Sequence, residues 1–205
     1  MLGAKFPFRE VCFERKISHV SSFISCIQAA DVYEKGLSLN VMSKAYGLPG
    51  LRIGWIASAD KHVLTELERY KHYLSICNSA PSERLAVIAL GVREKLLEKS
   101  RNLMQVNVKK LDSFFGDYPE IFDWQHPDGS SIGFPRFKGR GGVEAFCKDL
   151  VEENGVLLLP ASIYHSELMS APMDRFRIGF GRANIDAGLT AFREFMNRKH
   201  NELAP

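Results

Sequence analysis

The chain has 205 residues, a length that fits one large domain or two small ones and is sufficient to bury a hydrophobic core. Hydrophobic residues make up 45% of it and charged residues 25%, which is ordinary for a soluble globular protein and excludes collagen, a coiled coil or general disorder. The net charge of +3, from 27 basic and 24 acidic residues, comes with no basic run and so argues against nucleic-acid binding.

Cysteine spacing and hydropathy favour a cytoplasmic location. The four cysteines are far apart and form no CxxC pair, which favours reduced thiols over a disulfide framework or a zinc site. No stretch reaches the roughly 18 apolar residues that a membrane helix needs. A signal peptide is the less favoured interpretation of residues 17–30, because polar residues interrupt that apolar run. We expect a protein that binds neither a membrane nor a metal.

The first 58 residues change in character near Asp31. Residues 1–30 show no hydrophobic period and no motif, so their structure is unclear. From Asp31 to Ser58, short apolar runs alternate with glycine and proline, which is the pattern of strands bounded by turns. We expect a buried strand over residues 37–42 and a second strand over residues 53–57.

The next segment has the spacing of helices. Asp60 is placed to cap a helix that runs to about Leu74. A further helix is expected from Ser82, directly after Pro81, and its hydrophobic spacing continues almost unbroken to Phe115. A helix of that length would connect two lobes.

The C-terminal part has the pattern of an α+β unit, with helices packed on a small antiparallel sheet. The Asn154-Gly155 pair is a typical helix end. The expected strands cover residues 122–124, 131–137, 156–159 and 175–180, and the expected helices cover residues 143–153 and 185–198.

The residues that could bind a ligand or take part in a reaction are concentrated between the first two expected strands. Lys44 follows the expected buried strand, where desolvation would lower the pKa of its amine and leave the neutral form that condenses with carbonyl groups. The loop after it contains Gly47, Pro49 and Gly50, and glycines let a backbone approach a ligand closely. Arg52 opens the next strand with a guanidinium suited to phosphate or carboxylate. From these residues alone, a tight turn between a strand-end lysine and a surface arginine is an equal alternative.

The thirteen residues Ser43–Trp55, S-K-A-Y-G-L-P-G-L-R-I-G-W, closely resemble the cofactor-lysine motif of class I and II aminotransferases, which use pyridoxal 5′-phosphate (PLP) and have PLP fold type I. The segment is most similar to the histidinol-phosphate aminotransferase and threonine-phosphate decarboxylase branch. The resemblance implies that Lys44 holds the cofactor aldehyde as a Schiff base and moves a proton between substrate and cofactor. It also implies that Arg52 pairs with the cofactor phosphate and that Ser43 lies beside the cofactor. Val41 stands where many members have a phosphate-binding serine or threonine.

A second match lies far downstream. Residues 174–181, D-R-F-R-I-G-F-G, resemble the late strand of the family, whose arginine binds the substrate α-carboxylate. The residue in register is Arg177, and a bidentate guanidinium there would fix the substrate with its Cα–H bond over Lys44. Arg175 and Arg182 are nearby alternatives. The non-functional interpretation is a strand-edge arginine in a surface salt bridge.

The resemblance covers about residues 31–200, the C-terminal half of a family member. The residues with which the family contacts the cofactor ring come before this half. We therefore expect an α/β chain with a partial fold type I large domain followed by an α+β small C-terminal domain. In this division, residues 1–30 are an N-terminal segment of unclear structure, residues 31–80 are the remnant of the PLP-binding domain, and residues 81–205 are a linking helix and the small domain.

The function that the resemblance implies is a PLP-dependent aminotransferase, acting as a homodimer on an amino acid and a 2-oxo acid. The lack of recognisable ring contacts predicts an N-terminally truncated enzyme that is weak or inactive alone. Two alternatives stay open. One is a non-catalytic remnant that acts as a binding partner, and the other is a PLP lyase or decarboxylase on the same scaffold.

Overall fold

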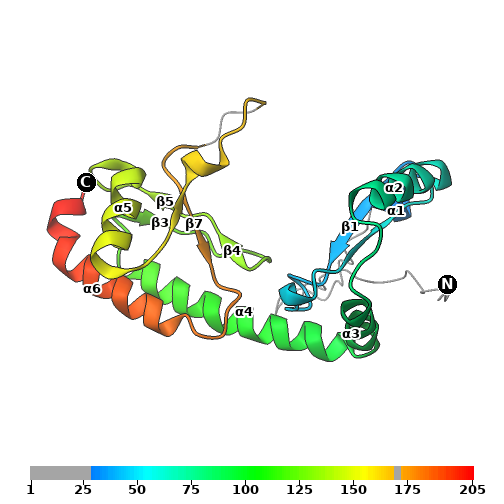
Figure 1. The fold of residues 1–205 in the computed structure, drawn as a ribbon. Helices are drawn as coiled ribbons and strands as arrows, with labels where there is room; N and C mark the ends of the chain where they lie inside the picture. The colour runs from blue at the N-terminus through cyan, green and yellow to red at the C-terminus, as the bar shows by residue number, and fades with distance from the viewer. Residues whose placement is uncertain (1–28, 169–171) are drawn as a thin grey trace. The chain divides into compact units, whose positions relative to one another are not determined.

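A computed structural model describes residues 29–168 and 172–205 (Figure 1). The expectation for residues 1–30 therefore falls almost entirely outside the described residues. The chain divides into two compact units, the first ending at Ser100 and the second beginning at Arg101. The boundary falls within the helical region that we expected to link two lobes.

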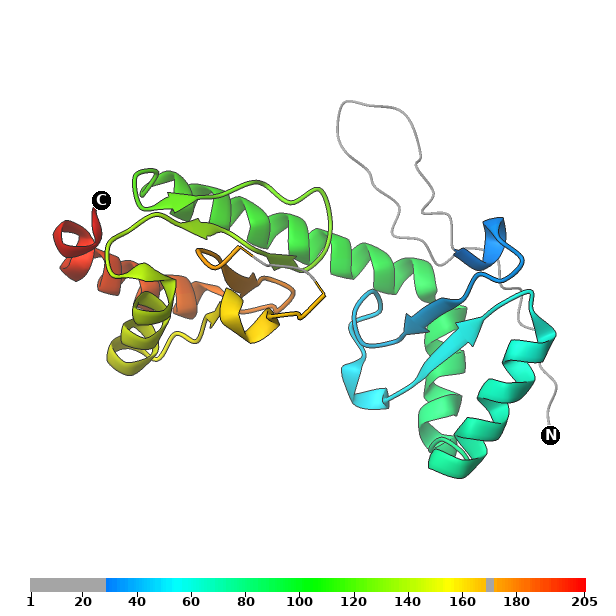
Figure 2. The ribbon, with the colours of Figure 1, turned by 90° about the horizontal axis from the view of Figure 1, so that it is seen from above.

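The first unit is built around an antiparallel hairpin of β1 (Ser38–Val41) and β2 (Gly54–Ala57), which lie side by side in Figure 2. A one-turn helix, α1 (Ala29–Val32), precedes it. Both expected strands are confirmed in position. The expectation that the first strand is buried is wrong: alternate side chains of a strand point to opposite faces, and Leu39 is 74% exposed on one of them. On the other face, Trp55 packs toward the apolar cluster of the unit.

The next helix, α2 (Lys61–Leu74), begins and ends where the sequence predicts. The Asp60 carboxylate accepts hydrogen bonds from the backbone N–H groups of His62 (3.0 Å) and Val63 (3.1 Å). These bonds satisfy two of the donors that every helix start leaves unpaired. No residue of α2 is fully buried, so this cap is a main stabilising feature at the start of the helix.

The expected, almost unbroken helical stretch is present, with one interruption at Val92 that divides it into α3 (Ala80–Gly91) and α4 (Arg93–Gly116). The first of these begins after the N-cap Ser79, slightly earlier than the expected start at Ser82. Between the two helices, Val92 leaves the helical conformation and its N–H bonds back to the last turn of α3. A glycine followed by a β-branched residue has low helix propensity, which explains the break.

The second unit contains the expected small antiparallel sheet, in the strand order β4–β7–β6, and a separate strand pair, β3–β5. The strands are β3 (Phe122–Asp123), β4 (Ile132–Gly133), β5 (Arg136–Phe137), β6 (Leu159–Pro160) and β7 (Phe176–Gly179). Two expected strands differ in extent. The run 131–137 is divided at Pro135, which has no N–H for a ladder, and only Leu159 of the run 156–159 is paired.

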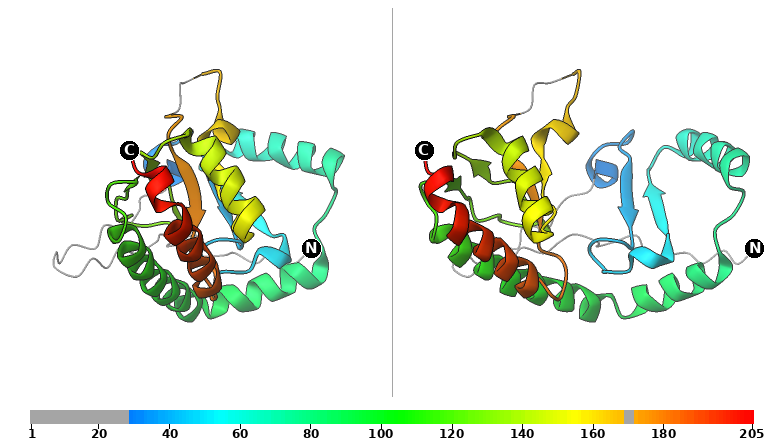
Figure 3. Two further views of the ribbon diagram at one scale, coloured as in Figure 1. Left: turned by 90° about the vertical axis from the view of Figure 1, so that its left-hand side faces the viewer. Right: turned by 60° about the vertical axis from the view of Figure 1, so that its left-hand side comes forward.

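Two helices pack against each other on this unit, as expected. They are α5 (Gly142–Asn154) and α6 (Asp186–Leu203), and Figure 3 shows them beside the strands. Gly155 ends α5 with a left-handed φ of 68°, which glycine adopts without strain. The core between the layers is rich in phenylalanine, and Phe146 of α5 stacks on Phe137 with 4.4 Å between ring centroids.

A buried asparagine ties the end of β7 to α4. Asn107 is 1% exposed, and its side-chain amide donates hydrogen bonds to the backbone carbonyls of Phe180 (2.8 Å) and Arg182 (2.7 Å). Both carbonyls follow directly after β7. A buried polar group that loses its partner costs about 1–3 kcal/mol, so this amide fixes the end of the strand on the helix.

We predict that Asn107→Ala lowers the free energy of unfolding by about 2–3 kcal/mol, because it leaves two carbonyls without their donor. The matched control is Asn102→Ala, which removes the same side chain from an exposed position on the same helix and should change stability by less than about 0.5 kcal/mol. Urea unfolding followed by circular dichroism measures both. Equal effects of the two substitutions would contradict the assigned role of Asn107.

Candidate functional site

The loop between β1 and β2 carries Lys44, and its backbone is held by its own hydrogen bonds. The Met42 N–H donates to the Ile53 carbonyl (3.0 Å), and the Leu48 N–H donates to the Met42 carbonyl (3.0 Å). At the outer turn, the Lys44 carbonyl accepts a hydrogen bond from the Gly47 N–H (3.1 Å). Gly47 has a φ of 66°, in the left-handed region that favours glycine. The turn after Lys44 therefore requires the glycine that the sequence supplies.

Two side chains anchor this loop in an apolar cluster. Met42 is 0% exposed and Tyr46 is 3% exposed, and both pack with Ala86 and Ala89 of α3. Lys44 lies midway between the two anchors and is exposed. The expectation that Lys44 lies at the end of a buried element, with its amine desolvated, is therefore wrong for the described structure. The hydrophobic residues on either side turn inward, and the lysine between them points to solvent.

The Tyr46 phenol is a neutral anchor for the loop. Its hydroxyl is buried and has no hydrogen-bond partner among the residues that the structure describes. Burial raises the pKa of this phenol, although the nearby positive charge of Arg93 opposes the shift. Tyr46 is therefore a packing residue of the loop.

Arg52 occupies a strained position at the other end of the loop. It follows the short 3-10 helix η1 (Pro49–Leu51) and has a φ of 54° and a ψ of 33°, the left-handed conformation. A residue with a Cβ adopts this conformation at a cost on the order of 1 kcal/mol, and such residues are concentrated at functional sites. The exposed guanidinium donates through Nη1 to the Pro49 carbonyl (3.2 Å). This single contact leaves most of its five donors free for an anion.

Gly54 allows the two strands to approach closely. A Cβ at this position would lie 2.8 Å from the Asn40 carbonyl oxygen and 2.9 Å from Cγ1 of Val41, its partner across the hairpin. Gly50, in η1, faces open space instead. Gly54 is therefore required by the close packing of the two strands of the hairpin.

The structure places three of the four predicted site residues on one loop of the first unit: Ser43, which is partly exposed, Lys44 and Arg52. An exposed primary amine and an exposed guanidinium thus come from the same short segment. The fourth residue, Arg177, belongs to the second unit.

Arg177 lies on the face of β7 opposite to the core. Its neighbours Phe176 and Ile178 are buried, so the strand alternation directs the Arg177 side chain away from them. Its Nη1 donates to the Tyr164 hydroxyl (3.1 Å), at the end of η2 (Ala161–Tyr164). Tyr164 is the residue that sequence analysis missed, because its contact with Arg177 arises only through the pairing of β6 with β7.

The structure separates Arg177 from its two alternatives. The Arg175 guanidinium donates to the Phe134 carbonyl (3.0 Å) and thereby supports the neighbouring turn. Arg182 lies beyond the end of β7, where its own backbone carbonyl is bound by Asn107. Arg177 is the member of the three that stands on the strand and contacts another polar side chain on its open face.

Within residues 29–168 and 172–205, no helix is long and apolar enough to cross a membrane. The same residues contain no group of three or more metal-binding side chains close enough to hold an ion.

Comparison with known sequences gives a family match over most of the chain. Residues 10–192 match the family described as aminotransferase class I and II. Capreomycidine synthase from Streptomyces vinaceus is 31% identical over 163 residues, which cover 78% of this chain and 40% of that protein. Aspartate aminotransferase from Thermotoga maritima is 25% identical over 150 residues, which cover 71% of this chain and 37% of that protein.

Comparison with solved structures also finds PLP-dependent enzymes. A PLP-dependent aminotransferase from Streptococcus suis superimposes with a TM-score of 0.73 at 30% identity, over 82% of this chain and 43% of that one. The PLP-dependent cyclase OrfR superimposes with a TM-score of 0.69 at 26% identity, over 80% of this chain and 43% of that one. The chain thus spans about two fifths of the length of the relatives that it matches.

We predict that Gly54→Ala destabilises the protein by about 1–3 kcal/mol, because the added Cβ overlaps backbone and side-chain atoms of β1. Gly50→Ala is the matched control in the same loop and should leave stability unchanged or raise it by up to about 1 kcal/mol. Urea unfolding, with hydrogen exchange of the hairpin amides, measures both variants. A loss from Gly50→Ala as large as that from Gly54→Ala would contradict the packing that we describe.

Proposed function

The chain belongs to the aminotransferase class I and II family, and on that premise we propose that it binds PLP at Lys44 and transfers an amino group between an amino acid and a 2-oxo acid. Family membership and the structural neighbours confirm the expected fold type I and give PLP as the cofactor. The observation that carries the proposal is the pairing of an exposed amine and an exposed guanidinium on one loop. These groups match the aldehyde and the phosphate of PLP.

Each residue of the loop has a distinct role in this proposal. The Lys44 amine would hold the cofactor through its aldehyde and would move the proton at the substrate Cα. Arg52 binds the phosphate as a fork of parallel N–H donors. Ser43 offers a hydroxyl beside the lysine. When bound, the cofactor supplies an electron-withdrawing ring that makes bonds to the substrate Cα breakable.

Arg177 is proposed to bind the substrate α-carboxylate. Its guanidinium lies on the open face of β7 and has one described hydrogen bond, to Tyr164. A bidentate contact there would orient the substrate and would distinguish amino acids from amines that lack a carboxylate. Homodimer formation and the histidinol-phosphate branch rest on the sequence resemblance, a cytoplasmic location rests on cysteine spacing and hydropathy, and all three stay predictions.

A second reaction class stays open beside amino-group transfer, as an alternative that the family match does not favour. Capreomycidine synthase and the cyclase OrfR are not named as aminotransferases, although the matches cover 78% and 80% of this chain. Which bond at the substrate Cα breaks depends on how the substrate is oriented, so the Lys44 loop alone is compatible with elimination or ring closure. Analysis of the products separates these reactions from amino-group transfer.

We predict that Lys44 is the residue that captures PLP. Incubation of the full chain with PLP, followed by borohydride reduction and peptide mass spectrometry, should place the reduced adduct on Lys44. Lys44→Ala should abolish the visible absorption band of the complex, whereas Lys61→Ala, which removes an exposed lysine of α2, should leave it intact. Persistence of the band in Lys44→Ala would contradict the assignment.

The same experiment tests Arg52. Arg52→Gln should weaken capture of PLP by about tenfold, because one charge-assisted contact to the phosphate is lost. It should leave capture of pyridoxal, which lacks the phosphate, unchanged. An equal effect on both aldehydes would show that Arg52 acts through the shape of the loop.

We further predict slow amino-group transfer by this chain. With PLP, an amino acid and a 2-oxo acid present, the keto product of the donor should form only in variants that retain Lys44. Its repeated formation should require the acceptor, because amino-group transfer has to deliver the amino group to a 2-oxo acid. Release of ammonia without an acceptor would instead support the lyase alternative, and the absence of both products would support a non-catalytic binding role.

A further inference from the structure

The open face of the sheet in the second unit has room beside Arg177. Cross-strand partners share a face, which places Leu159 of β6 next to Arg177 and Ile132 of β4 next to Gly179. Gly179 has no side chain, and a Cβ at that position would meet no atom within 4 Å. The guanidinium therefore stands at the edge of an open area with two aliphatic residues on its floor.

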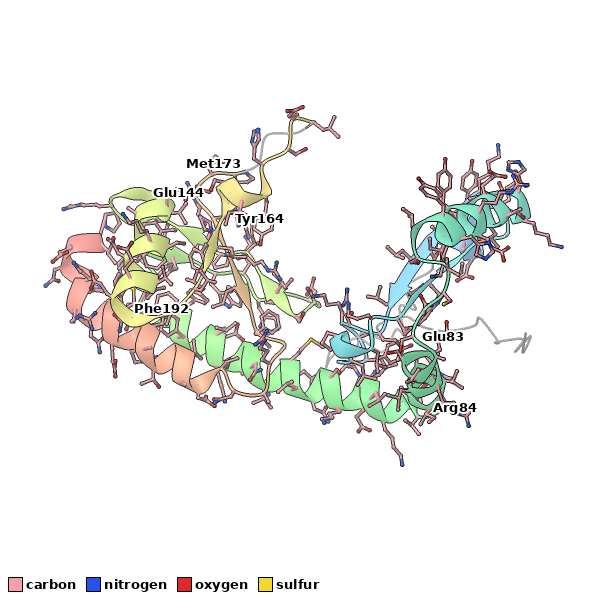
Figure 4. The ribbon with its side chains drawn as sticks, in the orientation of Figure 1. Glu83, Arg84, Glu144, Tyr164, Met173 and Phe192 are labelled. Carbon is pink, nitrogen blue, oxygen red and sulfur yellow. The ribbon has the colours of Figure 1, made fainter. Side chains whose placement is uncertain are left out.

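Tyr164 holds the guanidinium at this edge. Its hydroxyl oxygen accepts the hydrogen bond from Nη1 of Arg177 at 3.1 Å. Its ring meets Phe134 edge to face, with 6.1 Å between centroids and an interplanar angle of 84°. Figure 4 labels Tyr164 at the end of η2. The ring is thus fixed by an aromatic neighbour, and a fixed ring keeps its hydroxyl at the arginine.

The arrangement of donors indicates what binds here. The phenol oxygen uses a lone pair to accept from Arg177, so its own proton is available for another acceptor. The hydrogen bonds of the described residues include no acceptor for that proton. A guanidinium and a phenol proton, side by side, both require electron pairs. A carboxylate offers two oxygens with several lone pairs and satisfies both donors at once, whereas an amide offers a single acceptor oxygen.

We propose that Tyr164 is a positioning residue that aims the Arg177 guanidinium and donates its phenolic proton to the same substrate carboxylate. This inference rests on the proposed function and adds a second donor to the carboxylate site. It accounts for the Tyr164 hydroxyl, because a phenylalanine at this position would make the same ring contact with Phe134.

The test measures protection of Arg177 in the full chain. Phenylglyoxal modifies arginines, and peptide mass spectrometry follows Arg177 and, as an internal reference, the exposed Arg84 of α3. The probes are 3-phenylpropanoate and its amide, which have the same hydrocarbon part and no keto group to react with lysine. The variants are Tyr164→Phe, which keeps the ring, and Tyr33→Phe, which removes a hydroxyl from an exposed tyrosine of the first unit.

We expect the carboxylate to slow modification of Arg177 but not of Arg84, and the amide to protect neither. In Tyr164→Phe the half-protecting carboxylate concentration should rise about tenfold, which is the loss of one hydrogen bond to a charged group. In Tyr33→Phe it should not change. The thermal unfolding midpoint of Tyr164→Phe should stay at the wild-type value, so that the change reports binding and not folding.

Three results would overturn the inference: equal half-protecting concentrations in wild type and Tyr164→Phe, equal protection by acid and amide, or no protection of Arg177 in the wild type. Each would mean that the Tyr164–Arg177 bond is only a surface hydrogen bond. Failure of PLP capture by Lys44, with protection of Arg177 intact, would instead overturn the proposed function. The two failures are distinguishable because Lys44 and Arg177 belong to different units.

Discussion

The insertion of Met42 and Tyr46 into the apolar cluster over α3 is the interaction on which the candidate cofactor site depends. Both side chains leave water almost completely, and the residue midway between them is forced to point outward. That residue is Lys44. The loop's other apolar residues, such as Leu48 and Leu51, are only partly buried against this cluster, so Met42 and Tyr46 are its most deeply buried anchors. The position of the amine is therefore a packing property, set by two hydrophobic neighbours in the sequence.

Arg52 shows that the loop is arranged for something other than stability. A left-handed arginine costs free energy that a glycine at the same position would not, and its only described contact is to a carbonyl of its own turn. The exposed guanidinium thus serves no evident structural purpose. An anion held by Arg52 would offset the backbone strain, which agrees with a phosphate-binding role. Tyr164 in the second unit is comparable, because its hydroxyl contributes nothing to the packing of its ring against Phe134.

Local features of the sequence predicted much of the fold. The Asp60 cap and the Gly155 helix end were predictable because each depends on residues within one turn. The strands that flank Lys44 were also located correctly, but the burial of the first was not. Whether Leu39 is covered depends on neighbouring layers and not on the strand itself. Likewise, the break at Val92 results from two weak propensities that a long amphipathic pattern conceals.

Contacts between residues that are distant in the sequence could not be predicted from the sequence. Asn107 binds carbonyls more than seventy positions away, and nothing in its own helix distinguishes it from the exposed Asn102. Tyr164 meets Arg177 only because β6 and β7 pair in one register. The Lys44 and Arg177 motifs were recognisable because they resemble a family. The residues that hold Arg177 in place became visible only with the fold.

The central claim is that a single PLP molecule is held covalently by Lys44 and electrostatically by Arg52. A crystal structure of the chain grown with PLP tests it most directly. We predict continuous electron density from Nζ of Lys44 to the cofactor, with the phosphate hydrogen-bonded to the Arg52 guanidinium. Density that joins the cofactor to another lysine, or a phosphate that lies away from Arg52, would contradict it.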